Sequence, residues 1–289
     1  MVKVEKRKLS AGLYFVATPI GTARDITLHA LDILTSADII AAEDTRSMRK
    51  LLDIHGIALG GRPVVSYHDH SSEKSRNALI ENVKNGQSVA YASEAGTPLI
   101  ADPGYHLVQD AYDADVPLYS APGPSAIIVA LTLAGMPTDR FLFEGFLPNS
   151  QNQRRTQLQE LSDIPATLVF YESPKRVAAM LKDAAEVLGA ERHGAVCREL
   201  TKKFEQVRRG SLQDLAEQAV NDPPRGEIVV IIDRNRSDKN KDLDLDSEIR
   251  KALTHMSVKD TADAVAKAFG LKKRDVYQRV LQIGQNRTG

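Results

Sequence analysis

The sequence has a single cysteine, Cys197, and no excess of either charge, because 38 basic residues face 38 acidic ones in 289 residues. One cysteine forms no internal disulfide, and no Cys/His pair has the spacing of metal ligands, so neither a disulfide-rich secreted fold nor a zinc cluster is expected. A net charge of zero also excludes a uniformly basic nucleic-acid coat. These absences indicate a globular protein of a reducing compartment, the cytoplasm, in which Cys197 is a small core residue.

Long hydrophobic runs are also missing. After a basic start, the first apolar stretch covers only residues 11–17, which is too short for a secretion signal. The longest apolar run, residues 126–136, has about half of the ~20 residues that a membrane-spanning helix needs. We therefore expect a soluble protein with no membrane partner.

The sequence lacks the usual phosphate-binding loops. It contains no G-x-x-x-x-G-K-[ST] motif, and no G-x-G-x-x-G motif at its first β-α turn. Hydrolysis of nucleoside triphosphates and standard dinucleotide binding are therefore not expected. Metal binding is not expected either.

Short runs of β-branched and aromatic residues alternate with helical patterns, which predicts an α/β fold with parallel-rich sheets and helices on their faces. In the first part of the chain the expected strands are 13–17, 38–42, 63–66, 88–92 and 117–120. The expected helices are 27–34, 46–54, 73–84, 106–112 and 125–133.

A second α/β series is expected after the polar stretch 149–155. Its expected strands are 167–171, 194–197 and 227–232, and its expected helices are 174–188 and 212–220. Ser173 before Pro174 predicts one helix start. A serine hydroxyl can accept a hydrogen bond from a free backbone amide of the first turn, and proline at the first helical position has no amide hydrogen that would stay unbonded. Ser211 with Asp214 predicts another, as a near capping box.

The C-terminal part is different in character. Residues 233–248 are almost entirely polar and predict a linker, whereas a capping box at Ser257 and Asp260 predicts helices beyond it, one ending at Gly270 and another over 274–283. We expect domains at 1–120 and 121–235, and a linker with a small helical domain at 236–289. Between residues 250 and 289, nine Lys/Arg face three acids. This excess indicates either a helix-turn-helix that contacts RNA or a small solvated bundle.

Three loops rich in glycine, proline and small residues follow predicted strands, at 18–22, 93–98 and 121–125. The carboxyl ends of parallel strands meet at one edge of a sheet, where open α/β proteins bind ligands. Each loop alone can be a simple turn. Together they predict a pocket for a ligand with little phosphate.

Polar clusters at two other predicted strand ends allow two interpretations each. Glu43 and Asp44 can orient or deprotonate a substrate hydroxyl, or Asp44 can simply cap the next helix while Arg46 pairs with a neighbour. His68 and His70 can bind substrate or lie in a solvated loop. The sequence leaves both pairs of alternatives open.

Basic residues gather at strand ends in the second series, at 171–176 and 198–203, with Arg208 and Arg209 nearby. Arginine and lysine supply most of the affinity for a nucleic-acid backbone, so these residues can form a wall that faces RNA. The alternative is an ordinary solvated surface. At the start of the last predicted helix, Lys272, Lys273 and Arg274 oppose the helix dipole, a conflict that an anionic partner would remove.

Nine blocks in order resemble the ribosomal RNA small subunit methyltransferase I family, a member of the tetrapyrrole (precorrin) methylase superfamily. They are VATPIGTARDITLHALDIL, IIAAEDTR, SYHDHSSE, SEAGTPLIADPGYHLV, APGPSA, DRFLFEGFLP, FYESPKR, RELTKKFE and GEIVVII. The resemblance covers about residues 13–232, and the tail resembles the family's small helical C-terminal domain. One departure is Glu94, where the family usually has aspartate.

The resemblance implies a two-domain, tetrapyrrole-methylase-like α/β fold that binds S-adenosylmethionine between its halves and acts as a homodimer. The implied reaction is methylation of the ribose 2'-hydroxyl of a cytidine in the decoding region of 16S rRNA, with the rRNA or the small ribosomal subunit as partner. Two rivals are methylation of a tetrapyrrole or other small molecule by the same fold, and a non-catalytic RNA-binding protein. The basic tail disfavours the first rival, and the intact cofactor loops disfavour the second.

The resemblance also implies a set of site residues. The expected cofactor contacts are Thr18, Pro19, Gly21, Gly96, Thr97, Pro98, Ile100, Ser125, Ala126, Tyr171, Leu200 and Gly226. The acids expected on the substrate side, as catalytic candidates, are Glu43, Asp44 and Asp102. The expected RNA contacts are Arg24, Arg46, Lys175, Arg176, Arg198, Lys202, Lys272, Lys273 and Arg274.

Overall fold

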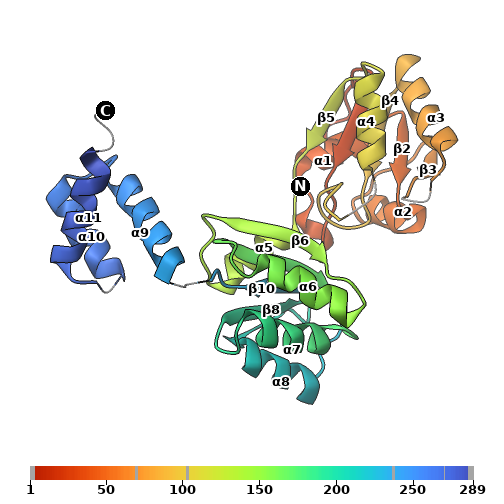
Figure 1. Ribbon diagram of the computed structural model, residues 1–289. Coiled ribbons are helices and arrows are strands. Elements are labelled where there is room, and N and C mark those ends of the chain that lie inside the picture. Colours follow the sequence, from red (N-terminus) through yellow and green to blue (C-terminus); the bar gives the residue numbers. More distant parts are fainter. Residues whose placement is uncertain (1–3, 69–70, 102–103, 236–237, 270, 286–289) are drawn as a thin grey trace.

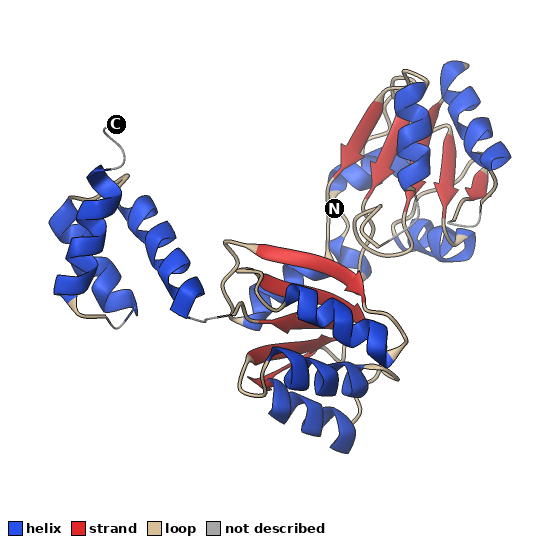
Figure 2. Cartoon of the chain, in the orientation of Figure 1, coloured by secondary structure: helices blue, strands red, loops and turns tan. Residues whose placement is uncertain are grey.

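The computed structural model describes residues 4–68, 71–101, 104–235, 238–269 and 271–285. The chain forms two α/β lobes, each built on a five-stranded sheet, followed by a bundle of helices that stands apart from both sheets in Figures 1 and 2. Within those ranges, no helix combines the length and the apolar character that crossing a bilayer requires.

The first sheet is parallel throughout, with the strand order β3-β2-β4-β1-β5. Its strands are β1 (Gly12–Val16), β2 (Ile39–Ala42), β3 (Val64–Ser66), β4 (Ser88–Ala92) and β5 (Leu118–Ala121). Helices α1 (Leu28–Ser36) and α2 (Thr45–Ile54) cover one face, and α3 (Glu73–Lys84) and α4 (Tyr105–Asp113) cover the other. Because both faces are covered, β1, β2 and β4 are buried along their whole length.

Three helices of this lobe begin at side-chain caps that satisfy free backbone amides. The hydroxyl of Thr27 accepts from the Ala30 amide at 3.1 Å, and that of Ser72 accepts from the Ser75 amide at 3.3 Å. The Asp44 carboxylate accepts from the amide of Arg46 at 2.7 Å. The short 3-10 helix η1 (Ala23–Asp25), which precedes α1, has no such cap of its own. The predicted elements of this lobe are therefore confirmed to within a few residues.

The second sheet has the order β6-β7-β10-β8-β9, and only its β6–β7 pair is parallel. Its strands are β6 (Phe141–Phe146), β7 (Thr167–Glu172), β8 (His193–Arg198), β9 (Gln206–Ser211) and β10 (Ile228–Ile232). Helices α6 (Gln151–Leu161), α7 (Val177–Leu188) and α8 (Leu212–Asn221) cover one face. The expected parallel arrangement thus holds for the first sheet, while the second sheet is mixed.

Helix α5 (Ala126–Ala134) covers the other face of the second sheet, although it follows β5 of the first sheet directly. Its buried residues Ile127, Ala130 and Leu131 pack against Val169, Ala195 and Ile231. The chain therefore passes from the first lobe to the second between β5 and α5. Ser125 of this stretch also lies between the lobes.

Two expectations for the start of the second series were wrong. The polar stretch 149–155 does not precede the series, because β6 comes first and most of that stretch is the beginning of α6. Helix α7 starts at Val177 rather than at Pro174, and the side chain of Ser173 does not cap it. The amides of Arg176 and Val177 instead bond to the Ser173 carbonyl at 3.0 Å each, which forms a turn. The Ser211 cap of α8 is confirmed, at 3.1 Å from the Asp214 amide.

The expected linker at 233–248 was also wrong from Asp238 onward, because α9 (Asp238–Ala252) begins there. Leu245 and Ile249, four residues apart, are buried against α10 (Val258–Phe269) and α11 (Lys273–Gln285). Asp246 forms an ion pair with Arg279 of α11 at 2.7 Å. A few well-spaced apolar residues were enough to make a polar segment helical.

The predicted pairing of Ser257 with Asp260 at the start of α10 is present as a serine cap. The Ser257 hydroxyl accepts from the Asp260 amide at 3.3 Å, and the Asp260 carboxylate accepts from that hydroxyl at 2.6 Å. Gly270, expected at the end of α10, lies outside the described residues.

Candidate functional site

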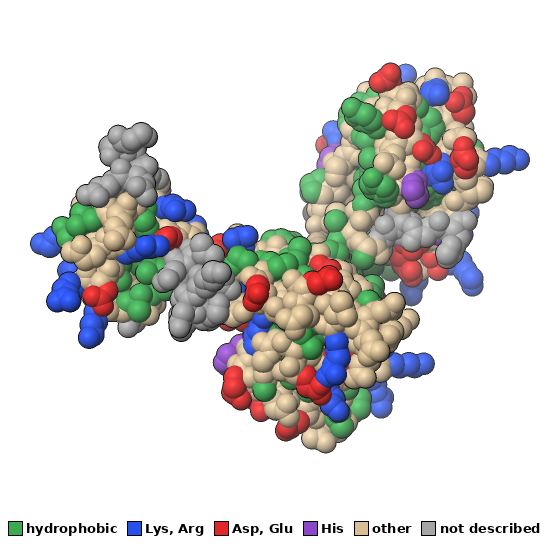
Figure 3. Space-filling model, in the orientation of Figure 1, with side chains coloured by type: hydrophobic (Ala, Val, Ile, Leu, Met, Phe, Trp, Pro, Cys, Tyr) green, Lys and Arg blue, Asp and Glu red, His purple; other side chains and the backbone are tan. Residues whose placement is uncertain are grey.

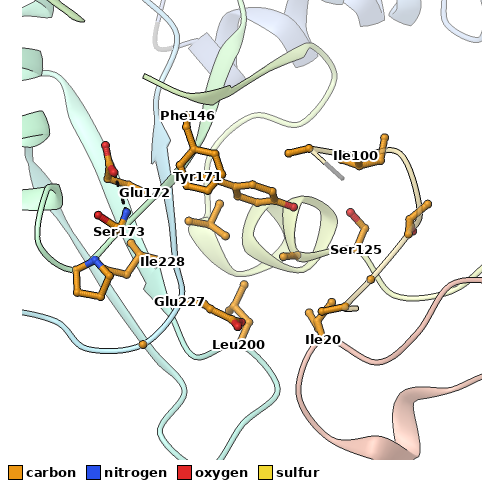
Figure 4. A pocket seen from close by; sticks show the side chains of 18 residues that line it. Ile20, Ile100, Ser125, Phe146, Tyr171, Glu172, Ser173, Leu200, Glu227 and Ile228 are labelled. Atoms are coloured by element: carbon orange, nitrogen blue, oxygen red, sulfur yellow. Dashed lines mark hydrogen bonds between the residues drawn. The ribbon is translucent and has the colours of Figure 1, made fainter. Parts of the chain in front are cut away.

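A cavity of about 410 Å³ lies between the two lobes, where loops from both sheets meet (Figure 4). The first lobe contributes residues after β1, β4 and β5, and the second contributes residues at the ends of β6, β7 and β8 and the start of β10. The lining is mostly apolar and comprises Ile20, Ala95, Gly96, Thr97, Ile100, Ala101, Ser125, Ala126, Phe146, Tyr171, Glu172, Ser173, Pro174, Leu200, Gly226, Glu227, Ile228 and Val229.

The first-lobe wall is held by hydrogen bonds between its three loops. Thr18 and Gly96 exchange backbone hydrogen bonds of 2.9 and 3.0 Å, and the hydroxyl of Ser93 donates to the Gly96 carbonyl at 2.7 Å. The hydroxyl of Thr97 donates to the Pro124 carbonyl at 3.0 Å. The loops after β1, β4 and β5 therefore form one rigid surface, as their joint occurrence in the sequence predicts.

Gly96 is required where these loops come closest. Its φ of 85° lies in the left-handed region, which favours glycine. A Cβ at this position would lie 3.2 Å from Cγ2 of Ile20 and 3.5 Å from the carbonyl oxygen of Pro124. The backbone of residue 96 therefore forms part of the cavity wall.

Aromatic side chains form the second-lobe wall. The ring of Tyr171 packs edge-on against Phe143 with centroids 4.9 Å apart, and it contacts Phe146 at 5.7 Å. In Figure 4 the Tyr171 side chain points across the cavity toward Ser125. This arrangement gives a flat apolar surface with a hydroxyl at its tip, facing the start of α5.

The second-lobe rim carries acidic groups. Burial raises the pKa of the Glu172 carboxyl, which accepts from the Ser173 amide at 2.7 Å and pairs with Arg176 at 3.2 Å. Hydrogen bonding from the Glu227 amide lowers the pKa of Glu199, whose carboxylate accepts at 3.0 Å from that amide and at 3.1 Å from Lys202. Lys202 also donates to the Glu227 carboxylate at 2.9 Å.

Backbone strain is concentrated around the cavity. Among the described residues, five non-glycine residues have positive φ, and four of these lie in the two loops that flank it: Leu99, Ala101, Glu199 and Thr201. Such conformations cost about 1–3 kcal/mol each and persist only where the surroundings enforce them. Their grouping beside this cavity makes it the candidate functional site.

Of the expected cofactor contacts, eight line this cavity: Gly96, Thr97, Ile100, Ser125, Ala126, Tyr171, Leu200 and Gly226. Thr18, Pro19 and Gly21 instead line a neighbouring cavity of about 230 Å³ on the first lobe. Pro98 belongs to neither lining. Ile20 lies in the predicted pocket loop 18–22, whereas Phe146, Ser173 and Pro174 are among the lining residues that the sequence did not predict. For Ser173 and Pro174 a usable signal was their position directly after β7.

The acids expected on the substrate side belong to the first lobe. Asp44 and Glu94 line the smaller cavity, and the Glu43 carboxylate accepts from the Glu94 amide at 3.3 Å. Asp44 caps α2, and hydrogen bonds from the Arg46 and Ser47 amides lower its pKa. Capping, one of the two interpretations left open, is therefore its observed role. Asp102 and His70 lie outside the described residues.

Some of the expected RNA contacts are exposed side chains, and others are held by hydrogen bonds or ion pairs within the protein. Arg24, Arg46, Lys175, Lys272 and Arg274 are exposed, and Lys273 is exposed but pairs with Asp263 at 2.6 Å. Arg198 is half-buried. Arg176 and Lys202 are held by the carboxylates described above, and Arg176 also bonds to the Leu147 carbonyl.

The proposed basic wall of the second lobe is weaker than the sequence suggested. Arg208 pairs with Asp222, and Arg209 donates to the carbonyls of Leu133 and Ala134 at the end of α5. Figure 3 shows Lys and Arg side chains on the visible face of the C-terminal bundle. Most of the exposed cationic side chains in this set thus lie on the first lobe and the bundle, where Arg274 also pairs with Asp275 at 3.9 Å.

Residues 12–216 match the model of the tetrapyrrole (corrin/porphyrin) methylases. Solved structures with this fold include a cobalt precorrin-4 methyltransferase, with a TM-score of 0.58 and 16% identity over 76% of this chain and 94% of that one. Another is uroporphyrin-III C-methyltransferase from Thermus thermophilus in complex with S-adenyl homocysteine, with a TM-score of 0.53 and 18% identity over 77% and 97%. The fold and its inter-lobe cavity define a methylase of this class.

Residues 240–284 match the RsmI C-terminal HTH domain. The ribosomal RNA small subunit methyltransferase I of Mesorhizobium japonicum is 45% identical over 97% of this chain and 95% of its own length. That of Haemophilus influenzae is 40% identical over 93% and 96%, and that of Mycobacterium tuberculosis is 42% identical over 94% and 95%. The chain belongs to the ribosomal RNA small subunit methyltransferase I family, as the nine sequence blocks indicate.

Proposed function

We propose that the protein transfers a methyl group from S-adenosylmethionine to the ribose 2'-hydroxyl of a cytidine in the decoding region of 16S rRNA. The observation that carries this proposal is the nearly full-length similarity to curated small-subunit rRNA methyltransferases, which includes both the methylase lobes and the C-terminal helical domain. The inter-lobe cavity supplies a place for the methyl donor.

The residues of the cavity suit S-adenosylmethionine. The ligand has little phosphate-like charge, and the cavity has apolar walls with a few polar groups, among them Thr97, Ser125 and Tyr171. The close backbone approach at Gly96 and the ring of Tyr171 can hold an uncharged, flat group between them. When bound, the cofactor supplies a methyl carbon already activated by the positive charge on sulfur.

The main task of the protein is then alignment. Holding a ribose oxygen about 3 Å from the reacting carbon converts a bimolecular encounter into an internal one. A carboxylate is a weak base for a sugar hydroxyl, so positioning contributes more than proton removal. Glu43 and Asp44, beside the smaller cavity, are the described acids that we propose for the substrate side.

The C-terminal bundle is the proposed first contact with rRNA. Residues 250–289 have nine Lys/Arg against three acids, and Lys272 and Arg274 are exposed at the beginning of α11. A target nucleotide must leave its stack to reach a cavity between two lobes. We propose that the bundle holds the surrounding RNA while the lobes receive the nucleotide.

We further propose that the protein acts as a homodimer in the cytoplasm. The cytoplasmic location rests on the substrate, because small-subunit rRNA is found there. The dimer rests on the resemblance to the superfamily alone, and sedimentation equilibrium of the full chain tests it.

The decisive experiment uses methyl-labelled S-adenosylmethionine and small ribosomal subunits from a strain that lacks this enzyme. We expect label in 16S rRNA, at one ribose that becomes resistant to alkaline cleavage of the adjacent phosphodiester. Label in a tetrapyrrole mixture instead would favour small-molecule methylation. No transfer to either, with RNA binding intact, would favour a non-catalytic RNA-binding protein.

A further inference from the structure

The turn between β8 and β9, residues 199–205, reaches from the second lobe to the first. The loop after β1 touches it at Gly21, where a Cβ would lie 2.4 Å from Oγ1 of Thr201 and 2.7 Å from Cγ of Lys202. The Thr22 amide also donates to the Thr201 hydroxyl at 3.4 Å. Leu200 of this turn and Ile20 of that loop both line the inter-lobe cavity. The 199–205 turn therefore lies at the seam of the two lobes, beside the proposed cofactor site.

The conformation of this turn is tightly fixed. Glu199 and Thr201 have φ values of 50° and 61°, which other contacts must enforce. The Glu205 carboxylate accepts from the Thr201 amide at 2.7 Å, and the Lys202 amide donates to the Glu199 carbonyl at 3.0 Å. Lys202 is further held between the carboxylates of Glu199 and Glu227. A side chain on this turn is consequently presented in a defined position.

The side chain presented at the end of the turn is a phenyl ring. Phe204 is 61% exposed, and the ammonium of the exposed Lys203 lies 5.5 Å from its ring centroid. Leaving a phenyl ring in water is unfavourable for folding, whereas the same ring is a good surface for stacking. The contacts of the turn hold its backbone in place while this ring stays mostly exposed.

We propose that Phe204 is a stacking platform for an unpaired base of the RNA substrate, next to the nucleotide that enters the inter-lobe cavity. This inference rests on the proposed function and adds a residue that positions the substrate. When a nucleotide leaves its stack, its neighbour loses one stacking surface, and an aromatic side chain replaces that surface in many single-stranded RNA complexes.

The charges near Phe204 fit RNA as the occupant. The ammonium of Lys203 is free of any described ion pair and lies beside the ring, so that a phosphate next to the stacked base can meet it. Arg24 is exposed two residues beyond Thr22, which touches the turn. An exposed ring beside a cation is typical of surfaces that bind single-stranded nucleic acid through stacking and backbone contacts together.

The test measures the affinity of the full chain for a fluorescent single-stranded ribo-oligonucleotide with the decoding-region sequence, over a series of salt concentrations. Phe204→Ala is expected to weaken binding about tenfold with an unchanged salt slope, because stacking involves no counterion release. Phe204→Trp is expected to bind like the parent, and Phe204→Leu, which keeps apolar surface without a ring face, like the alanine variant. Lys203→Ala is expected to reduce the salt slope.

Tyr112→Ala is the matched control, because Tyr112 is 78% exposed on α4. Equal RNA affinity of Phe204→Ala and Tyr112→Ala would overturn the proposal, as would full binding by Phe204→Leu. Conversion of a dimer to a monomer by Phe204→Ala in sedimentation equilibrium would overturn it too, because the ring would then belong to an interface between copies of this chain.

The proposed function is tested separately with the unaltered chain and small ribosomal subunits. If the unaltered chain methylates rRNA and Phe204→Ala does so with the same KM, the platform alone is wrong. If the unaltered chain neither binds nor methylates rRNA, the proposed function itself is wrong. Calorimetric titration with S-adenosylhomocysteine should give the same affinity for the parent and Phe204→Ala, since Phe204 is not in the cavity lining.

Discussion

Gly96 and Cys197 show how single positions are fixed by their surroundings. Gly96 combines a left-handed backbone with close neighbours from two other loops, so any side chain there is strained and crowds Ile20, which lines the inter-lobe cavity. Cys197 is fully buried in β8, between β10 and β9, on the face of the second sheet that α5 covers. The first residue is constrained by the site and the second by packing, and each constraint has a measurable consequence.

Gly96→Arg is expected to abolish binding of S-adenosylmethionine in isothermal titration calorimetry, because the side chain occupies the cavity. Gly86→Arg is the matched control. Gly86 has a nearly identical φ of 89°, but a Cβ there meets nothing within 4 Å. Both variants carry the same backbone strain, so cofactor affinity retained by Gly96→Arg would place the cofactor elsewhere.

The thiol of Cys197 is expected to resist alkylation by iodoacetamide in the folded protein at pH 8. Burial raises its pKa to about 11, so the reactive thiolate is almost absent at that pH, and the side chain is inaccessible as well. Labelling should begin only after unfolding in guanidinium. Rapid stoichiometric labelling of the native protein, followed by mass spectrometry, would contradict this packing.

At the scale of elements, the strands of the first sheet were predictable because each contains a short run rich in β-branched, aromatic or small apolar residues. Strand β6 was missed because Glu144 and Gly145 interrupt it, and the register shifts there between Phe143 and Gly145. Strand β9 was missed because it is a polar edge strand, QVRRGS, whose hydrogen bonds come from pairing with β8. Because this pairing depends on residues that are distant in sequence, the local sequence pattern does not predict it.

In the candidate site, too, some residues could be predicted from local sequence pattern and others could not. Its loops could be predicted because they follow apolar strands directly and are rich in glycine and proline. Phe146 could not be predicted, because it lies at the end of the missed strand β6. Ser173 and Pro174 were read as a helix cap, whereas they line the cavity and the helix begins three residues later. The local pattern predicted a cap for residues whose observed role is to line the cavity.

A buried ion pair joins two helices of the second lobe. Asp183 of α7 accepts from Arg154 of α6 at 2.7 Å and from Gln151 at 2.9 Å, and its side chain is 1% exposed. Asp183→Ala leaves the arginine charge buried without its partner. We expect a loss of about 3–5 kcal/mol in the free energy of unfolding, measured by denaturant titration.

Glu186→Ala is the control for that substitution. Glu186 also pairs with an arginine of α6, Arg155, but its side chain is 45% exposed. An exposed pair contributes about 0–1 kcal/mol, so this variant should unfold close to the parent. Equal destabilisation of both variants would mean that burial does not set the strength of the α6–α7 contact.

At the scale of the whole molecule, the lobes share a cavity while the C-terminal bundle has a hydrophobic core of its own, formed by residues of α9, α10 and α11. No described residue of the bundle lines the inter-lobe cavity. The expected domain boundaries at residues 120 and 235 stay a prediction, but the packing of α5 on the second sheet favours a division close to the end of β5.

Deletion of residues 236–289 is expected to leave cofactor affinity unchanged and to weaken binding of small-subunit rRNA. The salt dependence of RNA binding should become shallower, because fewer cations displace counterions from the phosphates. Filter binding at several salt concentrations measures both effects, and calorimetry checks the cofactor site. An unchanged slope would remove the bundle from RNA recognition.

The backbone crosses from one sheet to the other only once, through the short stretch between β5 and α5. Cleavage there would yield two fragments that each contribute residues to the cavity wall, with α5 left on the fragment whose sheet it covers. A small molecule filling the cavity would touch both fragments at once. The architecture is therefore suited to a split reporter, in which binding of the methyl donor brings the two fragments together.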